Sequence, residues 1–163
     1  MTATKVKSPA PEGLPLKETS AIVDQLRIAL AETIVTQMKA QNFHWNVTGM
    51  SFGSLHELFE KIYKDHFKAT DDLAERVRAL GAPVDGRYVT FLDTSEIDES
   101  NTALSAKQMV DALAADQRRL SSTLRELADV ADQHDDLVTN DMAIDRAGTH
   151  DKFAWMLAAH LDG

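Results

Sequence analysis

Residues 54–76 read SLHELFEKIYKDHFKATDDLAER, and this stretch decides the fold because it has the periodicity of one uninterrupted helix. The helix is expected to begin at Ser54, where Ser54 and Glu57 match a capping box, or at Ser51, and to end at Leu80 before the sequence GAPVDG. Apolar residues at helical spacing form one stripe, which we expect to be buried against other helices. The stripe consists of Leu55, Phe59, Ile62, Ala69, Leu73, Val77 and Leu80.

Two pairs of residues that commonly bind metals lie on the opposite side of this helix. His56 and Glu60 are four residues apart, and so are Asp71 and Glu75. On a helical wheel both pairs fall within an arc of roughly 100° that is centred about 150° from the apolar stripe. Glu60 and Asp71 are separated by a rise of about 16 Å, whereas a first-row metal holds its ligands at roughly 2.0 to 2.2 Å. One ion therefore cannot bind both pairs of the same helix.

A two-fold dimer would bring the two pairs together. The pairs are placed symmetrically about the middle of the helix, between residues 65 and 66. An antiparallel second copy would lay His56 against Glu75, and Glu60 against Asp71. Because a two-fold contact is self-complementary, it would create two identical sites, each with ligands from both chains.

His44, close to the end of the preceding helical segment, is positioned to supply a second imidazole to each site. The resulting set of two imidazoles and three carboxylates suits Fe(II), and to a lesser degree Mn or Zn. The alternative interpretation is that charged residues four apart on an exposed helix face form only solvated surface or salt bridges. His66 falls inside the apolar stripe, which predicts a hydrogen-bonded core histidine.

The rest of the chain shows three more long segments with the helical period, and Gly49 is a plausible stop for the first. Residues 87–101 have mixed signals and predict a short helix in a long crossover. The sequence thus predicts an all-α four-helix bundle with one long connection. The three other long helices are expected at residues 17–47, 103–130 and 137–161.

The 163 residues are enough for one domain, which we expect at 17–163 after a flexible tail at 1–16 that holds three of the four prolines. No cysteine is present, so a metal would be held by imidazole and carboxylate groups. The net charge of -9 disfavours attraction to nucleic acid and suits a protein that attracts cations. The lack of an apolar leader or of an apolar run near ~18 residues predicts a cytoplasmic, non-membrane protein.

Two motifs resemble the Dps family, the mini-ferritins also described as DNA-binding proteins from starved cells. They are NFHWNVTGMSFGSLHELFE at 42–60, with its twelve-residue step from His44 to His56, and DDLAERVRALG at 71–81. The sequence HDKFAWMLAAHL at 150–161 is similar to the last helix of the family. The resemblance covers about residues 18 to 162, and the fold it implies is a ferritin-like four-helix bundle.

The resemblance implies a hollow homo-dodecamer and an oxidoreductase activity. Members bind iron at the two-fold interfaces, oxidise Fe(II) preferably with hydrogen peroxide, and store ferric mineral inside. Glu60 stands at a position where many members have Asp. Because the Glu side chain is longer, two alternatives remain for it, direct binding of iron or binding through a water molecule. Trp45 resembles an aromatic residue that intercepts radicals, with packing alone as the alternative. The implied ligands are His44, His56 and Glu60 of one subunit with Asp71 and Glu75 of its neighbour.

The resemblance also raises the question of DNA. Family members that bind DNA use lysine-rich tails, and affinity then scales with the number of phosphates contacted. Here the few basic residues near the N-terminus are offset by acidic residues close to them in the sequence. The sequence therefore predicts at most weak, nonspecific DNA binding, and it leaves association with the nucleoid open. The basic residues are Lys5, Lys7 and Lys17, and the acidic ones are Glu12 and Glu18.

Two other functions remain open at this stage. One is a nucleoid-associated shell that protects DNA mainly by coating it, and the other is a bundle that uses the helix at 54–80 only to dimerise. Asp141 and Asp145 are candidates for a pore that admits iron at a three-fold axis, or form a plain surface pair. A ferritin site within one bundle is not supported, because none of the six histidines follows Glu at the Glu-x-x-His spacing.

Overall fold

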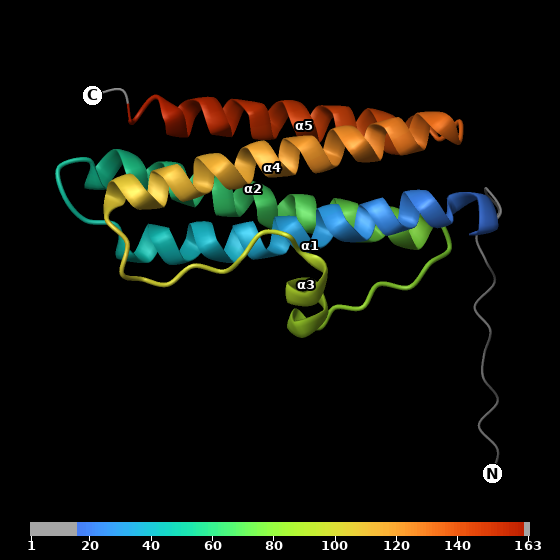
Figure 1. Ribbon diagram of the computed structural model, residues 1–163, viewed down its shortest axis with the longest axis horizontal. Helices are drawn as coiled ribbons and strands as arrows, with labels where there is room; N and C mark the ends of the chain where they lie inside the picture. Colours follow the sequence, from blue (N-terminus) through green and yellow to red (C-terminus); the bar gives the residue numbers. More distant parts are fainter. Residues whose placement is uncertain (1–15, 162–163) are drawn as a thin grey trace, which may run out of the picture.

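The computed structural model describes residues 16–161, and this part of the chain forms four long helices and one short helix without a strand (Figure 1). The predicted all-α four-helix bundle with a short helix in its crossover is therefore confirmed. The predicted tail lies outside the described residues except for Leu16, which begins the first helix. The helices are α1 (Leu16–Asn46), α2 (Phe52–Ala79), α3 (Tyr88–Thr94), α4 (Ala106–Gln133) and α5 (Leu137–Ala158).

The long helices form two hairpins that pack on one another. α1 lies along α2 and α4 lies along α5, while α1 also contacts α4 and the short helix α3. Because α2 ends and α4 begins at opposite ends of the bundle, the connection between them runs back along α1 (Figure 1). Within the described residues, no helix is both long and apolar enough to cross a membrane.

The start of α2 follows one of the two expectations from the sequence. Ser51 is the N-cap and α2 begins at Phe52, so the capping box assigned to Ser54 and Glu57 was wrong. The reason is that the amide of Leu55 already donates to the Ser51 carbonyl, 3.0 Å away, which forms the first turn earlier. The Ser54 hydroxyl donates to the same carbonyl at 3.1 Å instead of capping the helix.

Two glycines provide the turns that bound α2. Gly49 has φ 101° and Gly81 has φ 86°, values in the region that residues with a Cβ avoid. The predicted stop after α1 is thus confirmed, and so is the break after α2.

The start of α4 shows a signal that the sequence analysis missed. Ser105 and Gln108 form a reciprocal capping box: the Ser105 amide donates to Gln108 Oε1 at 2.8 Å, and the Gln108 amide donates to Ser105 Oγ at 3.3 Å. The helix therefore begins at Ala106, three residues later than expected. α5 begins at Leu137 as expected, after the N-cap Asp136.

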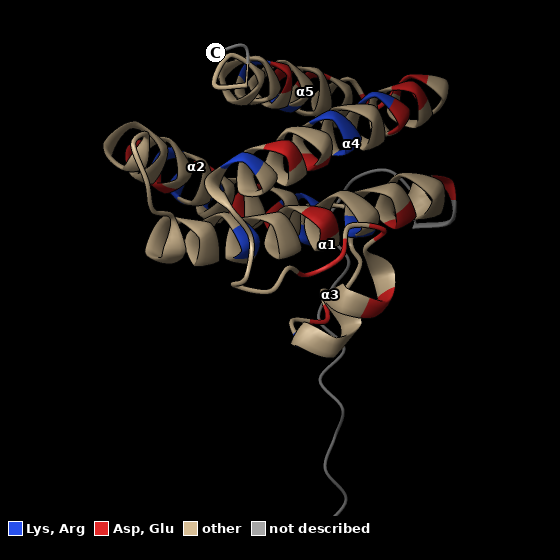
Figure 2. Ribbon diagram, turned by 60° about the vertical axis from the view of Figure 1, so that its left-hand side comes forward, with Lys and Arg blue, Asp and Glu red and all other residues tan. Residues whose placement is uncertain are grey.

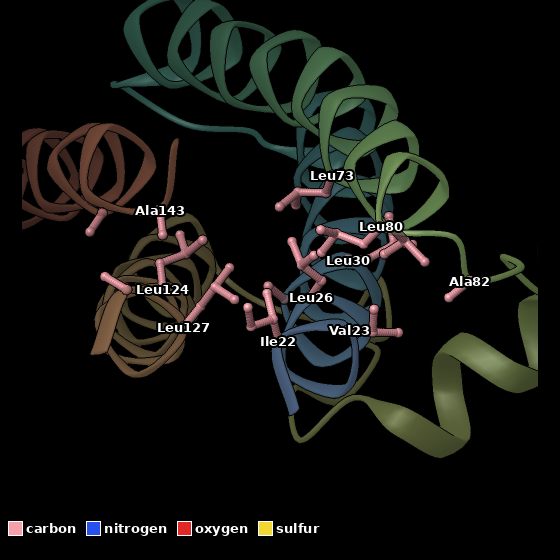
Figure 3. Packing of buried hydrophobic residues seen from close by; sticks show 14 residues of the cluster. Ile22, Val23, Leu26, Leu30, Leu73, Leu80, Ala82, Leu124, Leu127 and Ala143 are labelled. Carbon is pink, nitrogen blue, oxygen red and sulfur yellow. The ribbon is translucent and has the colours of Figure 1, made fainter. Parts of the chain in front are cut away.

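The core consists of two large apolar clusters, one toward each end of the bundle. Figure 3 shows the first, in which α1 and α2 meet α4 and α5 through Leu26, Leu30, Leu73, Leu124 and Ala143. The second cluster contains Phe43, Phe59, Met109 and Phe153 among others. All seven residues of the predicted α2 stripe are buried. Each large side chain buried in this way contributes about 1.5 to 3 kcal/mol.

A hydrogen-bonded ring of five side chains lies between the two clusters along α2, α4 and α5. Arg146 donates to both carboxylate oxygens of Asp65, at 3.1 and 2.8 Å, and to His150 Nε2 at 3.2 Å. His150 Nδ1 donates to Gln117 Oε1 at 2.7 Å, and Gln117 Nε2 donates to His66 Nε2 at 3.1 Å. His66 Nδ1 closes the ring on Asp65 at 3.3 Å. The prediction that His66 is a hydrogen-bonded core histidine is confirmed.

Candidate metal centre

The turn between α1 and α2 brings His44 and His56 into direct contact. Their rings stack with centroids 3.7 Å apart and planes inclined by 19°. Both side chains are half-buried. The pairing arises because the turn between Asn46 and Phe52 is short, so that the last turn of α1 lies beside the first turns of α2. Two of the predicted ligands are thus neighbours within one chain.

Two hydrogen bonds fix the orientation of this histidine pair. His44 Nδ1 donates to the backbone carbonyl of His56 at 2.8 Å, and His56 Nδ1 donates to the carbonyl of His44, also at 2.8 Å. A neutral imidazole that carries its proton on Nδ1 keeps the lone pair on Nε2, where a metal binds. A backbone carbonyl on the other ring nitrogen is the usual support of a metal-binding histidine. The pair is therefore oriented and in the tautomer that binds a cation.

Aromatic side chains flank the pair on both sides. The Phe52 ring stacks on His56 with centroids 5.0 Å apart, and the Tyr63 ring meets His44 edge-on at 5.3 Å. The sequence analysis did not select either residue. The contact between Phe52 and His56 could have been predicted, because the two residues are four apart and so lie on the same face of a helix. Trp45 follows His44 in the chain and is 61% exposed. Its predicted role in intercepting radicals stays a prediction.

Glu60 is half-buried and lies near the histidine pair. The pKa of Glu60 is lowered chiefly by a hydrogen bond and attraction from Lys64, with smaller contributions from the charges that His44 and His56 can carry. The carboxylate is therefore ionised at neutral pH and close enough to both rings to interact with them electrostatically. Lys64 was missed by the sequence analysis, although the spacing of four from Glu60 is the ordinary signal of a helical ion pair.

Asp71 and Glu75 are exposed on the other half of α2 and do not join the histidine pair in one chain. Among the described residues of a single chain, no three His, Asp or Glu side chains form a group that could hold a metal ion. Next to Glu75, Arg76 fixes the end of α2 to the start of α5. It donates to Asp136 at 2.7 Å and to Thr139 Oγ1 at 2.8 Å. The backbone that carries the two carboxylates is thus anchored while their side chains face outward.

The middle of the bundle is not suited to a divalent cation. The guanidinium of Arg146 already neutralises Asp65 there, and both ring nitrogens of His66 and of His150 are engaged in the hydrogen-bonded ring. Asp141 and Asp145 are exposed on α5, and their role in a pore stays a prediction.

Of the five predicted ligands, the structure brings only His44 and His56 into contact within one chain. The two Nε2 atoms could bind a first-row divalent cation such as Fe(II). Such ions take four to six ligands, so further donors would have to complete the site.

Comparisons with known proteins agree with the fold. The family model described as a ferritin-like domain matches residues 23–163. A DNA protection during starvation protein from Brevibacillus brevis is 37% identical over 133 residues, which cover 82% of this chain and 89% of that protein. The four-helix bundle, together with the match of the sequence to this family model, places the chain in the ferritin-like class of proteins.

Two solved structures narrow the class to a family. A Dps protein from Bacillus brevis superposes with a TM-score of 0.86 at 34% identity, covering 90% of this chain and 98% of the other. A Dps protein from Vibrio cholerae, described as a member of a broad superfamily of ferritin-like diiron-carboxylate proteins, gives 0.89 at 27% identity, covering 96% and 99%. The chain belongs to the Dps family of ferritin-like proteins.

Proposed function

We propose that the protein is a ferroxidase and iron store whose catalytic sites form between two-fold related subunits. In each site His44, His56 and Glu60 of one subunit would face two carboxylates of the other, Asp71 and Glu75. The observation that carries this proposal is that the two groups of predicted ligands lie at different places along α2, with His44 of α1 packed against the first group. Near the start of α2, His44 and His56 have Nε2 atoms that accept no hydrogen bond within the described residues. Further along α2, the exposed carboxylates of Asp71 and Glu75 lie where a two-fold axis near residues 65 and 66 would bring them to the histidines of a second copy.

The exposed apolar side chains of a single chain support a contact with a second copy. Four large apolar residues of α1 and α3 remain exposed and line one groove, and an exposed apolar surface of this kind is typical of one that another protein covers. They are Met38 at 45%, Trp45 at 61%, Tyr88 at 79% and Leu92 at 42%. On α2, Phe52 is 47% and Phe67 is 70% exposed, and α5 also exposes large apolar side chains.

The proposed donor set favours oxidation of iron. Ionised carboxylates are hard donors that stabilise Fe(III) more than Fe(II), and neutral imidazoles keep the affinity for Fe(II) moderate. Two Fe(II) ions held side by side each lose one electron, and one hydrogen peroxide molecule accepts both. With two protons, the O–O bond is then cleaved to two water molecules without release of a hydroxyl radical. Hydrogen peroxide is therefore the oxidant that we propose in preference to oxygen.

Storage and protection of DNA follow from the same chemistry. The Brevibacillus brevis relative is named for DNA protection during starvation, and removal of Fe(II) together with peroxide would protect DNA without direct contact. We extend the proposal to a hollow dodecamer in the cytoplasm that stores the ferric product. A shell that mainly coats DNA is the alternative function. The net charge of -9 disfavours it, and Figure 2 shows acidic residues gathered on the crossover around α3.

A complementation experiment tests whether the sites form between subunits. The double variants H44A/H56A and D71A/E75A should each lose peroxide-driven oxidation of Fe(II) by at least about tenfold, because each lacks one half of every site. When the two variants are coexpressed in equal amounts, half of the two-fold dimers combine both chains. Each mixed dimer has one intact site, so that about a quarter of the wild-type activity should return.

Failure to regain activity in a coassembled mixture would show that the two halves do not meet across subunits. Native mass spectrometry would verify that mixed particles have formed. If both double variants oxidise Fe(II) as fast as the wild type, the ferroxidase proposal is wrong and the DNA-coating alternative is favoured.

A further inference from the structure

We infer that the ammonium group of Lys64 occupies the place of a second cation at each site and limits how tightly a second divalent ion binds. This inference rests on the proposed function, because it concerns the same ligands. The observation behind it is that Glu60, the predicted carboxylate ligand on the same half of α2 as His56, is already engaged by a lysine. Lys64 Nζ contacts Glu60 Oε1 directly.

The geometry of this pair allows it to form and to break. Lys64 follows Glu60 by four residues on α2, with the acid nearer the N-terminus, which is the favourable order for an ion pair on a helix. The two side chains are 65% and 36% exposed. Exposed pairs of this kind add little to stability, so the lysine can leave the carboxylate without disturbing the fold.

The charges of the complete site explain why a lysine would matter there. The three proposed carboxylates carry three negative charges, and an imidazole that binds a metal ion through the lone pair on Nε2, with Nδ1 donating to a carbonyl, adds no charge. One divalent ion together with the Lys64 ammonium balances these charges. A second divalent ion leaves the site with excess positive charge, and that excess is larger while Lys64 remains. Binding of the second ion therefore requires the ammonium to move away from Glu60.

The chain offers a matched control for this charge. Lys61 is exposed on the same helix and forms no ion pair within the described part of the chain. Lys64→Met and Lys61→Met remove the same charge from the same helix, whereas Lys64→Arg keeps the charge. A comparison of the three separates the local contact with Glu60 from the overall charge of the protein.

Isothermal titration of the metal-free, assembled protein with Zn²⁺ measures both binding steps without oxidation. We expect the first ion to bind the wild type and Lys64→Met with similar affinity. The second ion should bind Lys64→Met about three- to tenfold more tightly, because a nearby positive charge has been removed in a partly solvated site. Lys61→Met and Lys64→Arg should match the wild type. Circular dichroism and native mass would verify that each variant folds and assembles.

The inference is overturned if Lys64→Met binds the second ion like the wild type, or if Lys64→Arg shows the same gain as Lys64→Met. The double variant H44A/H56A distinguishes this failure from failure of the proposed function. If that variant loses Zn²⁺ binding while Lys64→Met has no effect, the site stands and only the role of Lys64 is wrong. If H44A/H56A binds Zn²⁺ as the wild type does, the proposed site itself is wrong.

Discussion

The protein has one pair of histidines at the end of the bundle and another in its middle, and the two pairs differ in what their Nε2 atoms face. His44 and His56 donate from Nδ1 to backbone carbonyls, which leaves each Nε2 with its lone pair. His66 and His150 also donate from Nδ1, but their Nε2 atoms accept hydrogen bonds from Gln117 and Arg146. With the same tautomer, the pair at the end of the bundle keeps a free lone pair on each Nε2, where a cation could bind. The pair in the middle has no free lone pair on either ring.

Burial enlarges the difference between the two pairs. His66 and His150 are fully buried, whereas His44 and His56 are partly exposed. Burial lowers the pKa of His66, and it lowers the pKa of His150 well below the ordinary value, with nearby Arg146 acting in the same direction on both. If either ring of the buried pair were protonated on Nε2, that proton would point at a hydrogen-bond donor. The middle pair therefore stabilises the fold only while it is neutral.

The largest expected effect comes from breaking the ring in the middle of the bundle. His66→Ala should lower the free energy of unfolding by about 3 to 5 kcal/mol, because it leaves a cavity and removes a hydrogen-bond partner of buried Gln117 and of partly buried Asp65. His56→Ala should cost less than about 1 kcal/mol, since its ring is partly exposed. Urea unfolding at one fixed protein concentration measures both. Equal losses in the two variants would remove the distinction between the pairs.

A smaller effect is expected from a bound cation. Zn²⁺ at about 100 times its dissociation constant should raise the stability of the wild type by about 2.7 kcal/mol. The same increment should persist in His150→Asn, which alters only the ring, and should vanish in H44A/H56A. The comparison requires thermal or urea unfolding of each variant with and without Zn²⁺. An increment that depends on His150 instead would place the cation in the middle of the bundle.

The smallest expected effect is the dependence of stability on pH. In the unfolded chain His66 and His150 have ordinary pKa values near 6.5, whereas both are lowered in the fold. The unfolded state then binds more protons below about pH 6.5, so stability is complete above that pH and falls as the pH decreases. The loss should reach about 1 kcal/mol per buried histidine by pH 5.5.

Unfolding followed between pH 8 and pH 5.5 measures this dependence, and His150→Asn provides the control because it removes one of the two groups. Its stability should change less with pH than that of the wild type. An unchanged slope in the variant would mean that other groups cause the acid lability.

Most of the fold could be predicted because its signals are local. The apolar stripe of α2 repeats within one helix, so the buried face follows from the spacing of Leu55, Phe59 and the residues after them. Helix ends were harder to predict, because two serines near the start of α2, Ser51 and Ser54, could each cap it. The structure selects Ser51, and the capping box at Ser105 that delays α4 was present in the sequence but not recognised.

The candidate site was predicted in part. The spacing of residues along α2 indicated that His56 and Glu60 lie far from Asp71 and Glu75, and the structure keeps these pairs apart in one chain. The partners of His66 could not be predicted, because Gln117 lies 51 residues away in the sequence and His150 lies a further 33 beyond it. Contacts between helices so distant in the chain depend on how the bundle packs.

The sequence by itself determined the two faces of α2 and the mirror placement of its ligand pairs, since both follow from the fixed rise and turn of a helix. Only the tertiary structure decided that Nε2 is free in His44 and His56 and engaged in His66 and His150. That choice depends on the group opposite Nδ1 and Nε2, and packing brings those groups from other turns and other helices. Spacing alone carries no information about a tautomer, because a tautomer is set by hydrogen-bond partners in space.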